Sequence, residues 1–537
     1  MKMLKKLLCA LLTVCLMPLC AQAESESTTL TAPLLEGESA DPFLYEPLFD
    51  VLQFPEPSYQ PRLAQSYALN DNELTITLKP ELCWADGSPL TAQDVKASLY
   101  LDMLEDATML EHITAVETPS DDQVVIRFET PAEPLLAACL DQRIKARAAD
   151  WQEGMAEMDA LLAQRSFDPV EGVYPLDENF LAGIKAIQPP AAAPANSGYQ
   201  ISEETEEHLL LAKNPRYIFA EQCQFDTIRL IKCDAESAYA LACEGAFDVE
   251  WLSLSADQLS SLKESNEEIV TLWSPNEVQP LLYFDSSVNQ QARQAIWCAL
   301  DREAMLLECP VGVSGGDLYC TGLPAGWFSS LSDEDFLAEL TSWGYDLVNA
   351  EDILAEAGYA KNDEGFYADA TGNVLEVRLF VDESAQDLSA CAQVMLRSLH
   401  QAGISAVWAD SEEQANLFLK MLPCNRSRGP LSVYLHLRES GLLTSGERQL
   451  LHHLLTSSSA DSRRALTQSL MASLNKEARL SLIAECYLPF RLHNGQLTGY
   501  PMDPEQPLRQ LSGMNLLARL VTTGQLYLDT GAENETN

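Results

Sequence analysis

The feature that most constrains the fold is an alternation of strand-like and helix-like segments along the chain. Residues 74–79 place apolar side chains at every second position, which is the pattern of a half-buried strand. Residues 349–358 place them three and four positions apart, with Asn349 as a candidate N-cap and Gly358 as a candidate C-cap. The same helical spacing at 388–403 precedes another strand-like segment. This alternation predicts an α/β protein, and a length of 537 residues predicts two or three lobes.

The N-terminal segment has the three parts of a secretory signal peptide. Three lysines among the first six residues precede an apolar run at 7–20 and the small-residue motif at 21–23. The run is shorter than the roughly 20 residues that span a bilayer. We therefore expect cleavage near Ala23 and an exported protein, in the periplasm or on the outer face of the cell membrane. Lipid attachment at Cys20 is the alternative, although Leu19 occupies the position where lipoprotein signals carry a small residue.

Acidic residues outnumber basic residues by 80 to 34, which gives the chain a formal net charge of −46. Removal of residues 1–23 makes the charge still more negative, because they contain three lysines and no acidic residue. Such a field repels nucleic acid and anionic lipid headgroups, so neither is an expected partner. A solvated acidic surface accounts for this charge, and the same field would attract a cationic ligand.

The cysteines allow no complete pairing within one chain. Of 14 cysteines, three lie within residues 1–23, and the remaining 11 are odd in number, so at least one thiol is free or pairs with another molecule. A bridge between Cys309 and Cys320 is conceivable, whereas several other cysteines fall in apolar helical patterns that are typical of small core residues. Three further cysteines, spaced ten residues apart, are too distant in sequence for the usual spacing of zinc ligands.

A search for catalytic and metal-binding patterns gives no positive candidate. Residues 312–316 match the G-x-S-x-G nucleophile elbow, but Ser314 follows a helix-like segment instead of the buried strand that the elbow needs. We therefore expect Ser314 to lie in a loop. The seven histidines show neither the i, i+4 spacing of a zinc helix nor a neighbouring Cys-x-x-Cys motif. The sequence predicts no catalytic residue, no metal site and no cofactor.

Local architecture accounts for every notable residue of the segment at 82–99. Trp84 is a large apolar residue at the end of a strand, and Asp86–Gly87 is a turn signal. Thr91 is a suitable helix N-cap, and Asp94, three positions later, can complete a capping box. Apolar residues then recur on one helical face. Nothing in this segment requires a catalytic role.

The same segment carries a resemblance to a known family. Residues 63–99, with the core Trp-x-Asp-Gly-x-Pro-Leu-Thr-Ala-x-Asp-Val, resemble the N-terminal hallmark of the family 5 extracellular solute-binding proteins. These are the peptide- and nickel-binding subunits of ABC importers. Further matching segments follow in the order of the family, and the resemblance extends over residues 40–410. They are residues 197–201, 209–217, 244–252, 292–306 and 350–359.

The resemblance implies an α/β fold: a two-lobed, periplasmic-binding-protein-like clamshell with an extra small domain. It implies that a monomer holds a ligand between its lobes, performs no chemistry on it and delivers it to an ABC permease in the membrane. The proline-rich segment at 188–198 is expected to be an exposed connector. The expected parts are the signal peptide at 1–23, lobe I at 24–45, 195–275 and 490–537, the extra small domain at 46–190, and lobe II at 276–489.

Two departures from the family pattern concern the ligand. A loop that lies near the ligand in the family is shortened here to residues 43–45. Residues 422–440, where peptide-binding members often carry an aspartate that holds the amino terminus of the peptide, are basic and contain no aspartate. The family pattern and the positions of aromatic and acidic residues give four candidate ligand-binding residues: Tyr45, Tyr283, Asp285 and Trp408.

The expected function is the capture of short peptides by an extracytoplasmic subunit of an ABC importer. A metal chelate or a cationic solute is the alternative ligand within the same fold, in view of the acidic surface and the altered anchor region. An exported interaction or sensory protein that keeps the fold is the alternative of another class. A secreted hydrolase would need catalytic geometry at Ser314, which the local pattern does not predict.

Overall fold

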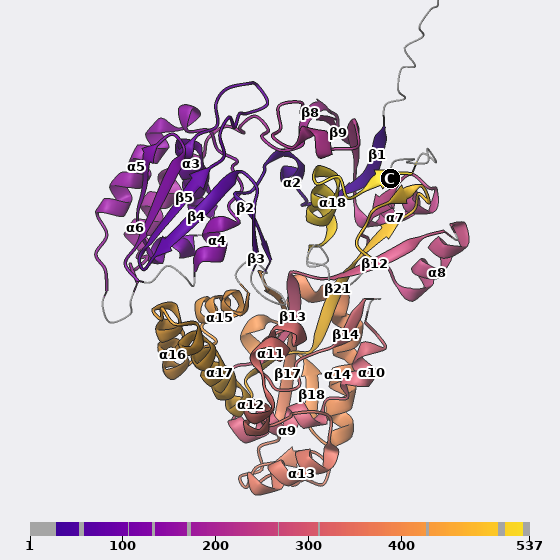
Figure 1. Cartoon of the computed structure of the whole chain (residues 1–537). Helices are drawn as coiled ribbons and strands as arrows, with labels where there is room; N and C mark the ends of the chain where they lie inside the picture. The colour runs from indigo at the N-terminus through magenta and orange to yellow at the C-terminus, as the bar shows by residue number, and fades with distance from the viewer. Residues whose placement is uncertain are drawn as a thin grey trace, which may run out of the picture.

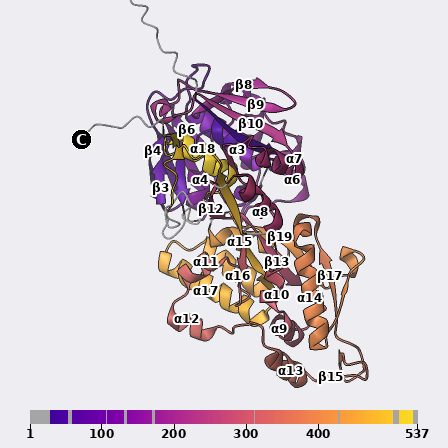
Figure 2. The same cartoon turned by 90° about the vertical axis from the view of Figure 1, so that its right-hand side faces the viewer.

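The computed structural model of the chain contains two bodies joined by strands that pass from one to the other. In Figure 1 a small domain and lobe I form the upper half and lobe II forms the lower half. The view in Figure 2, turned by 90°, shows the same separation. The upper body thus consists of two parts, the small domain and lobe I, and the lower body is lobe II. Each of these three parts is built around its own sheet, as described below. The described residues are 28–52, 58–105, 107–130, 135–168, 173–266, 268–309, 312–425, 429–502 and 511–529.

Lobe I is built around a four-stranded sheet that joins an N-terminal strand to strands from the middle of the chain. β1 lies parallel to β10, and β10, β9 and β8 pair antiparallel in that order. Helix α18 packs on α2, so segments from both ends of the chain meet in this lobe. The bounds are β1 (Thr29–Leu35), α2 (Asp41–Leu44), β8 (Tyr199–Glu204), β9 (His208–Lys213), β10 (Thr227–Cys233), α7 (Ala235–Cys243), β11 (Val249–Glu250), α8 (Ala256–Ser265) and α18 (Gly513–Thr522).

The small domain contains the strand predicted at 74–79, which the structure confirms as β5 (Glu73–Leu78) with alternate residues buried. Its long helix α3 begins directly after Thr91, as predicted, and the Asp94 carboxylate accepts a 2.7 Å hydrogen bond from the Thr91 N–H. One hydrophobic core runs through the small domain and lobe I. The other bounds are β2 (Phe49–Leu52), β3 (Ser58–Pro61), β4 (Ala64–Asn70), α3 (Ala92–Glu105), η1 (Ala107–Glu111), β6 (Ile113–Ser120), β7 (Gln123–Phe128), α4 (Leu136–Leu140), α5 (Gln152–Ala163) and α6 (Glu178–Ala186).

Lobe II is built around a five-stranded mixed sheet with the order β18-β17-β19-β13-β20. β17 lies between β18 and β19 and is parallel to both, whereas β13 is antiparallel to β19 and β20. The bounds of these strands are β13 (Val278–Phe284), β17 (Glu376–Val381), β18 (Ser405–Trp408), β19 (Leu417–Pro423) and β20 (Leu480–Leu482).

The helices predicted at 349–358 and 388–403 are present in lobe II as α13 and α14. Gly403 ends α14 in the left-handed conformation, with φ of +88°. α13 begins earlier than predicted, because Asp346 and not Asn349 accepts the hydrogen bonds of the first turn. The helices of this lobe are α9 (Gln290–Ala299), α10 (Arg302–Leu306), α11 (Ala325–Leu331), α12 (Glu334–Glu339), α13 (Leu347–Glu356), α14 (Ser389–Ala402), α15 (Pro430–Glu439), α16 (Ser445–Leu455) and α17 (Ala460–Glu477).

Two chain segments cross between the lobes, β12 to β13 and β20 to β21. Strand β21 (Ala484–Leu492) pairs with β14 (Val313–Gly315) at its start and with β11 and β12 (Val270–Pro275) further along. The buried Gln279 side chain binds both backbone groups of Cys486: it accepts from the N–H at 2.7 Å and donates to the carbonyl at 3.1 Å. This amide therefore ties the two crossing segments together.

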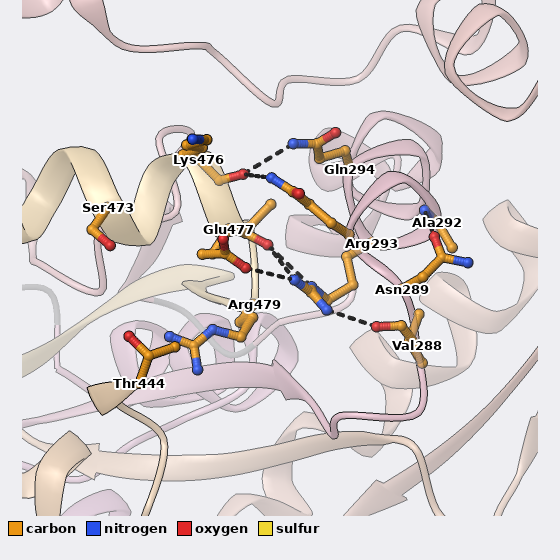
Figure 3. Close-up of polar contacts among 12 residues, drawn as sticks. Val288, Asn289, Ala292, Arg293, Gln294, Thr444, Ser473, Lys476, Glu477 and Arg479 are labelled. Carbon is orange, nitrogen blue, oxygen red and sulfur yellow. Dashed lines mark hydrogen bonds and ion pairs between the residues drawn. The ribbon is translucent and has the colours of Figure 1, made fainter. Parts of the chain in front are cut away.

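Arg293 of α9 holds the C-terminal end of α17, as Figure 3 shows. Its guanidinium donates to the Glu477 carbonyl at 3.1 and 2.8 Å and to the Val288 carbonyl at 2.6 Å. Trp297, one turn further along α9, donates to the Ala478 carbonyl at 2.8 Å. The last carbonyls of a helix have no intrahelical partner, so these donors satisfy groups that would otherwise be unpaired. This part of the family-like segment therefore has a structural role.

Candidate functional site

The candidate site is a cavity of about 790 Å³ between lobe I and lobe II. Lobe I contributes residues of the turn after β1 and the segment 251–257 after β11. Lobe II contributes residues 307–309 after α10 and Asp387. Leu488 of the crossing strand β21 completes the wall. Because both lobes form the walls, the cavity changes shape whenever the lobes move relative to one another.

Trp251 and Glu38 form the fixed part of the lobe I wall. The Trp251 ring stacks on Phe490 of β21, with centroids 6.5 Å apart and planes 6° from parallel. Its indole N–H donates to Glu38 at 2.7 Å, and the second oxygen of Glu38 accepts from the Leu35 N–H at 3.0 Å. Burial raises the pKa of Glu38, although these two hydrogen bonds oppose the rise. The carboxylate is therefore held at the cavity by the ring and by the backbone.

The charged residues that line this cavity are all acidic. Glu38 and Asp257 belong to lobe I, and Glu308 and Asp387 belong to lobe II. No lysine or arginine is among the described residues that line it. Four carboxylates around one cavity create a negative potential, which favours a ligand with a positively charged group.

The structure places Tyr45 in the core, away from this cavity. Its side chain is 6% exposed, and its hydroxyl donates to the Ala193 carbonyl at 2.9 Å. Burial, with a further contribution from Asp41, raises the pKa of Tyr45 to about 12. In this structure Tyr45 therefore has a structural role beside the connector around Ala193, and a ligand contact at Tyr45 stays a prediction.

Tyr283 and Asp285 are close together, but they line another cavity, of about 440 Å³, within lobe II. The Tyr283 ring stacks on Phe418 at 5.0 Å, and Asp285 accepts hydrogen bonds from the backbone and hydroxyl of Ser287. Trp408 lies on the edge strand β18, where it is 43% exposed and its indole N–H donates to the Gln393 side chain. None of the four predicted residues lines the cavity between the lobes.

The sequence analysis missed both fixed residues of the lobe I wall. Trp251 lies in the family-like segment 244–252, and an aromatic residue directly after a short strand was the available signal. Glu38 lies in a short turn with no pattern of its own. Its position becomes visible only through the hydrogen bond to Trp251, which is more than 200 residues away in the sequence.

Ser314 lies on the short strand β14, where it faces Glu485 of β21, so the prediction of a loop was wrong. The sequence could not show this, since the pairing partner is far away in the chain.

Within the residues that the structure describes, no group of three or more His, Cys, Asp or Glu side chains is placed to hold a metal ion. No helix of that part of the chain is long and apolar enough to cross a membrane. The predicted signal peptide lies outside the described residues.

Among the residues that the structure describes, one ion pair joins the small domain to lobe II. Arg438 of α15 donates to Glu111 of η1 at 2.6 Å, and both side chains are mostly buried. His112 lies beside the pair, 4.0 Å from the same carboxylate. Burial, and then the nearby charges of Arg438 and His452, lower the pKa of His112 to about 4. The histidine is therefore neutral at physiological pH, and the ion pair alone provides electrostatic attraction here.

We expect Arg438→Gln to shift the protein toward conformations in which the small domain and lobe II are further apart. The ion pair contributes about 1 kcal/mol, which changes such an equilibrium about fivefold. Small-angle X-ray scattering would measure this as a larger radius of gyration. Arg397→Gln, at an exposed position of α14, is the matched control. An unchanged radius for Arg438→Gln would show that the ion pair does not hold these bodies together.

Comparisons with known proteins agree with this architecture. The profile of the family "Bacterial extracellular solute-binding proteins, family 5 Middle" matches residues 58–419. No curated protein sequence matches the chain. Many solved structures are similar. The periplasmic oligopeptide-binding protein of an oligopeptide ABC transporter from Thermotoga maritima has 16% identity and a TM-score of 0.69, with 92% of this chain and 99% of that chain covered.

Two further solved structures carry ligands. The oligopeptide-binding protein AppA from Bacillus subtilis, in complex with a nonapeptide, has 14% identity and a TM-score of 0.63, with coverage of 93% of this chain and 98% of that chain. NikZ from Campylobacter jejuni, in complex with Ni(L-His), has 17% identity and a TM-score of 0.63, with coverage of 88% and 95%. These likenesses show the two-lobed clamshell fold, and the family profile covers most of the sequence. The chain belongs to family 5 of the bacterial extracellular solute-binding proteins, the solute-binding proteins of ABC importers.

Proposed function

We propose that this protein captures short peptides in the cavity between lobes I and II and delivers them, as a monomer, to an ABC permease. The observation that carries the proposal is the cavity of about 790 Å³ with walls from both lobes and from a crossing strand. Sites for small ligands in proteins are typically about 300–1,000 Å³ in volume. Movement of the lobes would open such a site to solvent and close it around the ligand. We retain the domain boundaries given above for these parts.

The second candidate ligand is a cationic solute, because the charged residues of the cavity wall are all carboxylates. A free peptide also carries an ammonium group at its amino terminus, so both ligands would use the same electrostatic feature. A carboxylate of the cavity can then bind the ammonium group in place of the aspartate that residues 422–440 lack. Glu38 is the candidate, because two hydrogen bonds hold its carboxylate at the cavity. Ni(L-His) in NikZ illustrates a metal chelate as a third ligand for this fold.

The test is a thermal-shift screen of the chain without residues 1–23 against pooled di- to pentapeptides, small organic cations and nickel–histidine. A ligand at 100 times its dissociation constant stabilises the folded protein by about 2.7 kcal/mol. The pool that raises the midpoint is then divided, and calorimetry measures the affinity of each active compound. A shift with peptides supports the proposal, and a shift with organic cations or nickel–histidine alone favours the other ligands. No shift with any pool contradicts ligand capture and favours the exported interaction protein.

For the ligand found in this way, we expect Glu38→Gln to weaken binding about tenfold, which corresponds to roughly 1.4 kcal/mol. Glutamine keeps the shape of the side chain and removes the negative charge. The matched control is Glu157→Gln, at an exposed position of α5 in the small domain. Equal affinities for the two variants would place the binding site elsewhere, and the second cavity at Tyr283 and Asp285 would be the next candidate.

A further inference from the structure

Three cysteines meet where the crossing strand β21 passes along lobe II. Cys309 follows α10, Cys391 lies in the first turn of α14, and Cys486 lies on β21. α10 packs on α14, and β14, a few residues after Cys309, pairs with β21 so that Val313 faces Cys486. All three are free thiols. The fold therefore brings three oxidisable side chains from distant parts of the chain together beside the crossing strand β21.

The side chains of Cys309 and Cys391 interact directly, because each is the first cause of the pKa shift of the other. The Cys309 sulfur also lies 3.5 Å from the Met305 carbonyl. Cys320, the other conceivable partner of Cys309, is fully buried beside Ser481 and Cys298. The geometry thus favours Cys391 over Cys320 as the partner of Cys309.

The two thiols of the pair differ in access. Cys309 is partly exposed and lines the cavity between the lobes, whereas Cys391 is 1% exposed. The hydrogen bond from Cys391 lowers the pKa of Cys309, while that hydrogen bond and burial raise the pKa of Cys391. Burial raises the pKa of Cys486 to about 12. A reagent in the cavity therefore meets the thiol that ionises most readily, with a second thiol directly behind it.

We propose that Cys309 and Cys391 form an oxidisable pair that a small external disulfide, entering through the cavity, closes to a protein disulfide. The Cys309 thiolate attacks one sulfur of the external disulfide, whose S–S bond breaks and releases one thiolate. The Cys391 thiol then loses its proton and attacks the Cys309 sulfur of the mixed disulfide, which releases the second external thiolate. Two protein thiols are oxidised, and one external disulfide is reduced to two thiols.

This site goes beyond ligand capture, and its chemistry does not depend on the proposed function. The disulfide would fix the segment after α10 to α14 and so hold the lobe II wall of the cavity in one position. Cys486 would remain a thiol, because the Gln279 side chain holds both backbone groups of Cys486 in place. Disulfides persist in extracellular compartments, and the proteins of this family are extracellular.

The experiment treats the chain without residues 1–23 with oxidised glutathione and follows it by intact mass and peptide mapping. We expect a loss of about 2 Da and one cross-linked peptide that joins Cys309 to Cys391. In C391S the reaction should stop at a glutathione adduct on Cys309, and in C309S neither product should form. C223S, at a buried cysteine of lobe I, should behave like the unchanged protein.

A second measurement needs no variant. Brief alkylation of the native, reduced protein should modify Cys309 faster than every other cysteine, as quantified by peptide mapping. The proposal is overturned if Cys309 reacts no faster than the buried cysteines, or if the cross-link forms between Cys309 and Cys486. If all thiols of the native, reduced protein persisted in excess oxidised glutathione, this result would also overturn the proposal.

Discussion

Replacing Glu46 with glutamine is expected to lower the free energy of unfolding by about 3–5 kcal/mol. Glu46 is 1% exposed and accepts hydrogen bonds from Arg62 at 2.5 Å and from Arg519 at 2.8 Å. Ser197 donates to its second oxygen at 2.8 Å. One carboxylate thus neutralises two buried guanidinium groups, one from the small domain and one from α18. Without it, Asp50 alone faces both arginines.

The same cluster predicts how this difference in stability depends on pH. Burial opposes ionisation of Glu46, but Arg519 and Arg62 outweigh it and hold the pKa of Glu46 well below its usual range. A carboxyl whose pKa is lower in the folded state stabilises the fold above its unfolded pKa of about 4.3 and loses that contribution as the pH falls. The difference between the two proteins should therefore be largest above about pH 5 and shrink below about pH 4. Burial raises the pKa of Asp50, so in the unchanged protein Asp50 acts in the opposite direction.

Denaturant unfolding at several pH values measures both effects. The matched control is Glu117→Gln, which also removes the carboxylate partner of an arginine, Arg127, but at an exposed position of the sheet. An exposed pair contributes about 0–1 kcal/mol, so this control should unfold nearly as the unchanged protein does. Similar decreases in the free energy of unfolding for the two variants would show that the buried cluster stabilises the contact between the small domain and lobe I no more than an exposed ion pair does.

The sequence predicts the fold well because the relevant signals are local or belong to the family. Alternation in β5 and helical spacing in α13 and α14 depend on neighbouring residues, and the segment at 63–99 carries the family resemblance. The structure and the comparisons confirm the α/β clamshell and the family. The start of α13 was misplaced because two capping residues, three positions apart, compete there.

The candidate site could not be predicted in the same way. Its walls come from segments that are far apart in the sequence, and Glu38, Trp251, Glu308 and Asp387 represent four of them. Each of these residues is unremarkable in its own segment, and only the pairing of β11 and β21 and the crossing between the lobes bring them together. Tyr45 is the opposite case. Its neighbours in sequence suggest a loop, but its hydroxyl donates a hydrogen bond to the carbonyl of Ala193, which is 148 residues away.

Trp84→Ala is expected to cost about 3–5 kcal/mol of folding stability, because truncation of a buried tryptophan leaves a large cavity. Trp84 is fully buried, and its backbone closes the turn through hydrogen bonds with Ser88 and Gly87. The next residue, Ala85, donates to the Ala195 carbonyl at 2.7 Å, so this turn also holds the connector to lobe I. Loss of the ring should therefore loosen the small domain and the connector together.

The matched control is Trp408→Ala, which removes the same side chain from an exposed edge strand and should change the stability by only about 0.5 kcal/mol. Denaturant unfolding of both variants gives the comparison, and calorimetry with the ligand found in the screen separates stability from binding. If Trp84→Ala unfolds readily but binds normally while folded, the segment at 82–99 has an architectural role. If its stability is unchanged and its affinity falls, that role is wrong, and the hallmark of the family in this chain would belong to the ligand site.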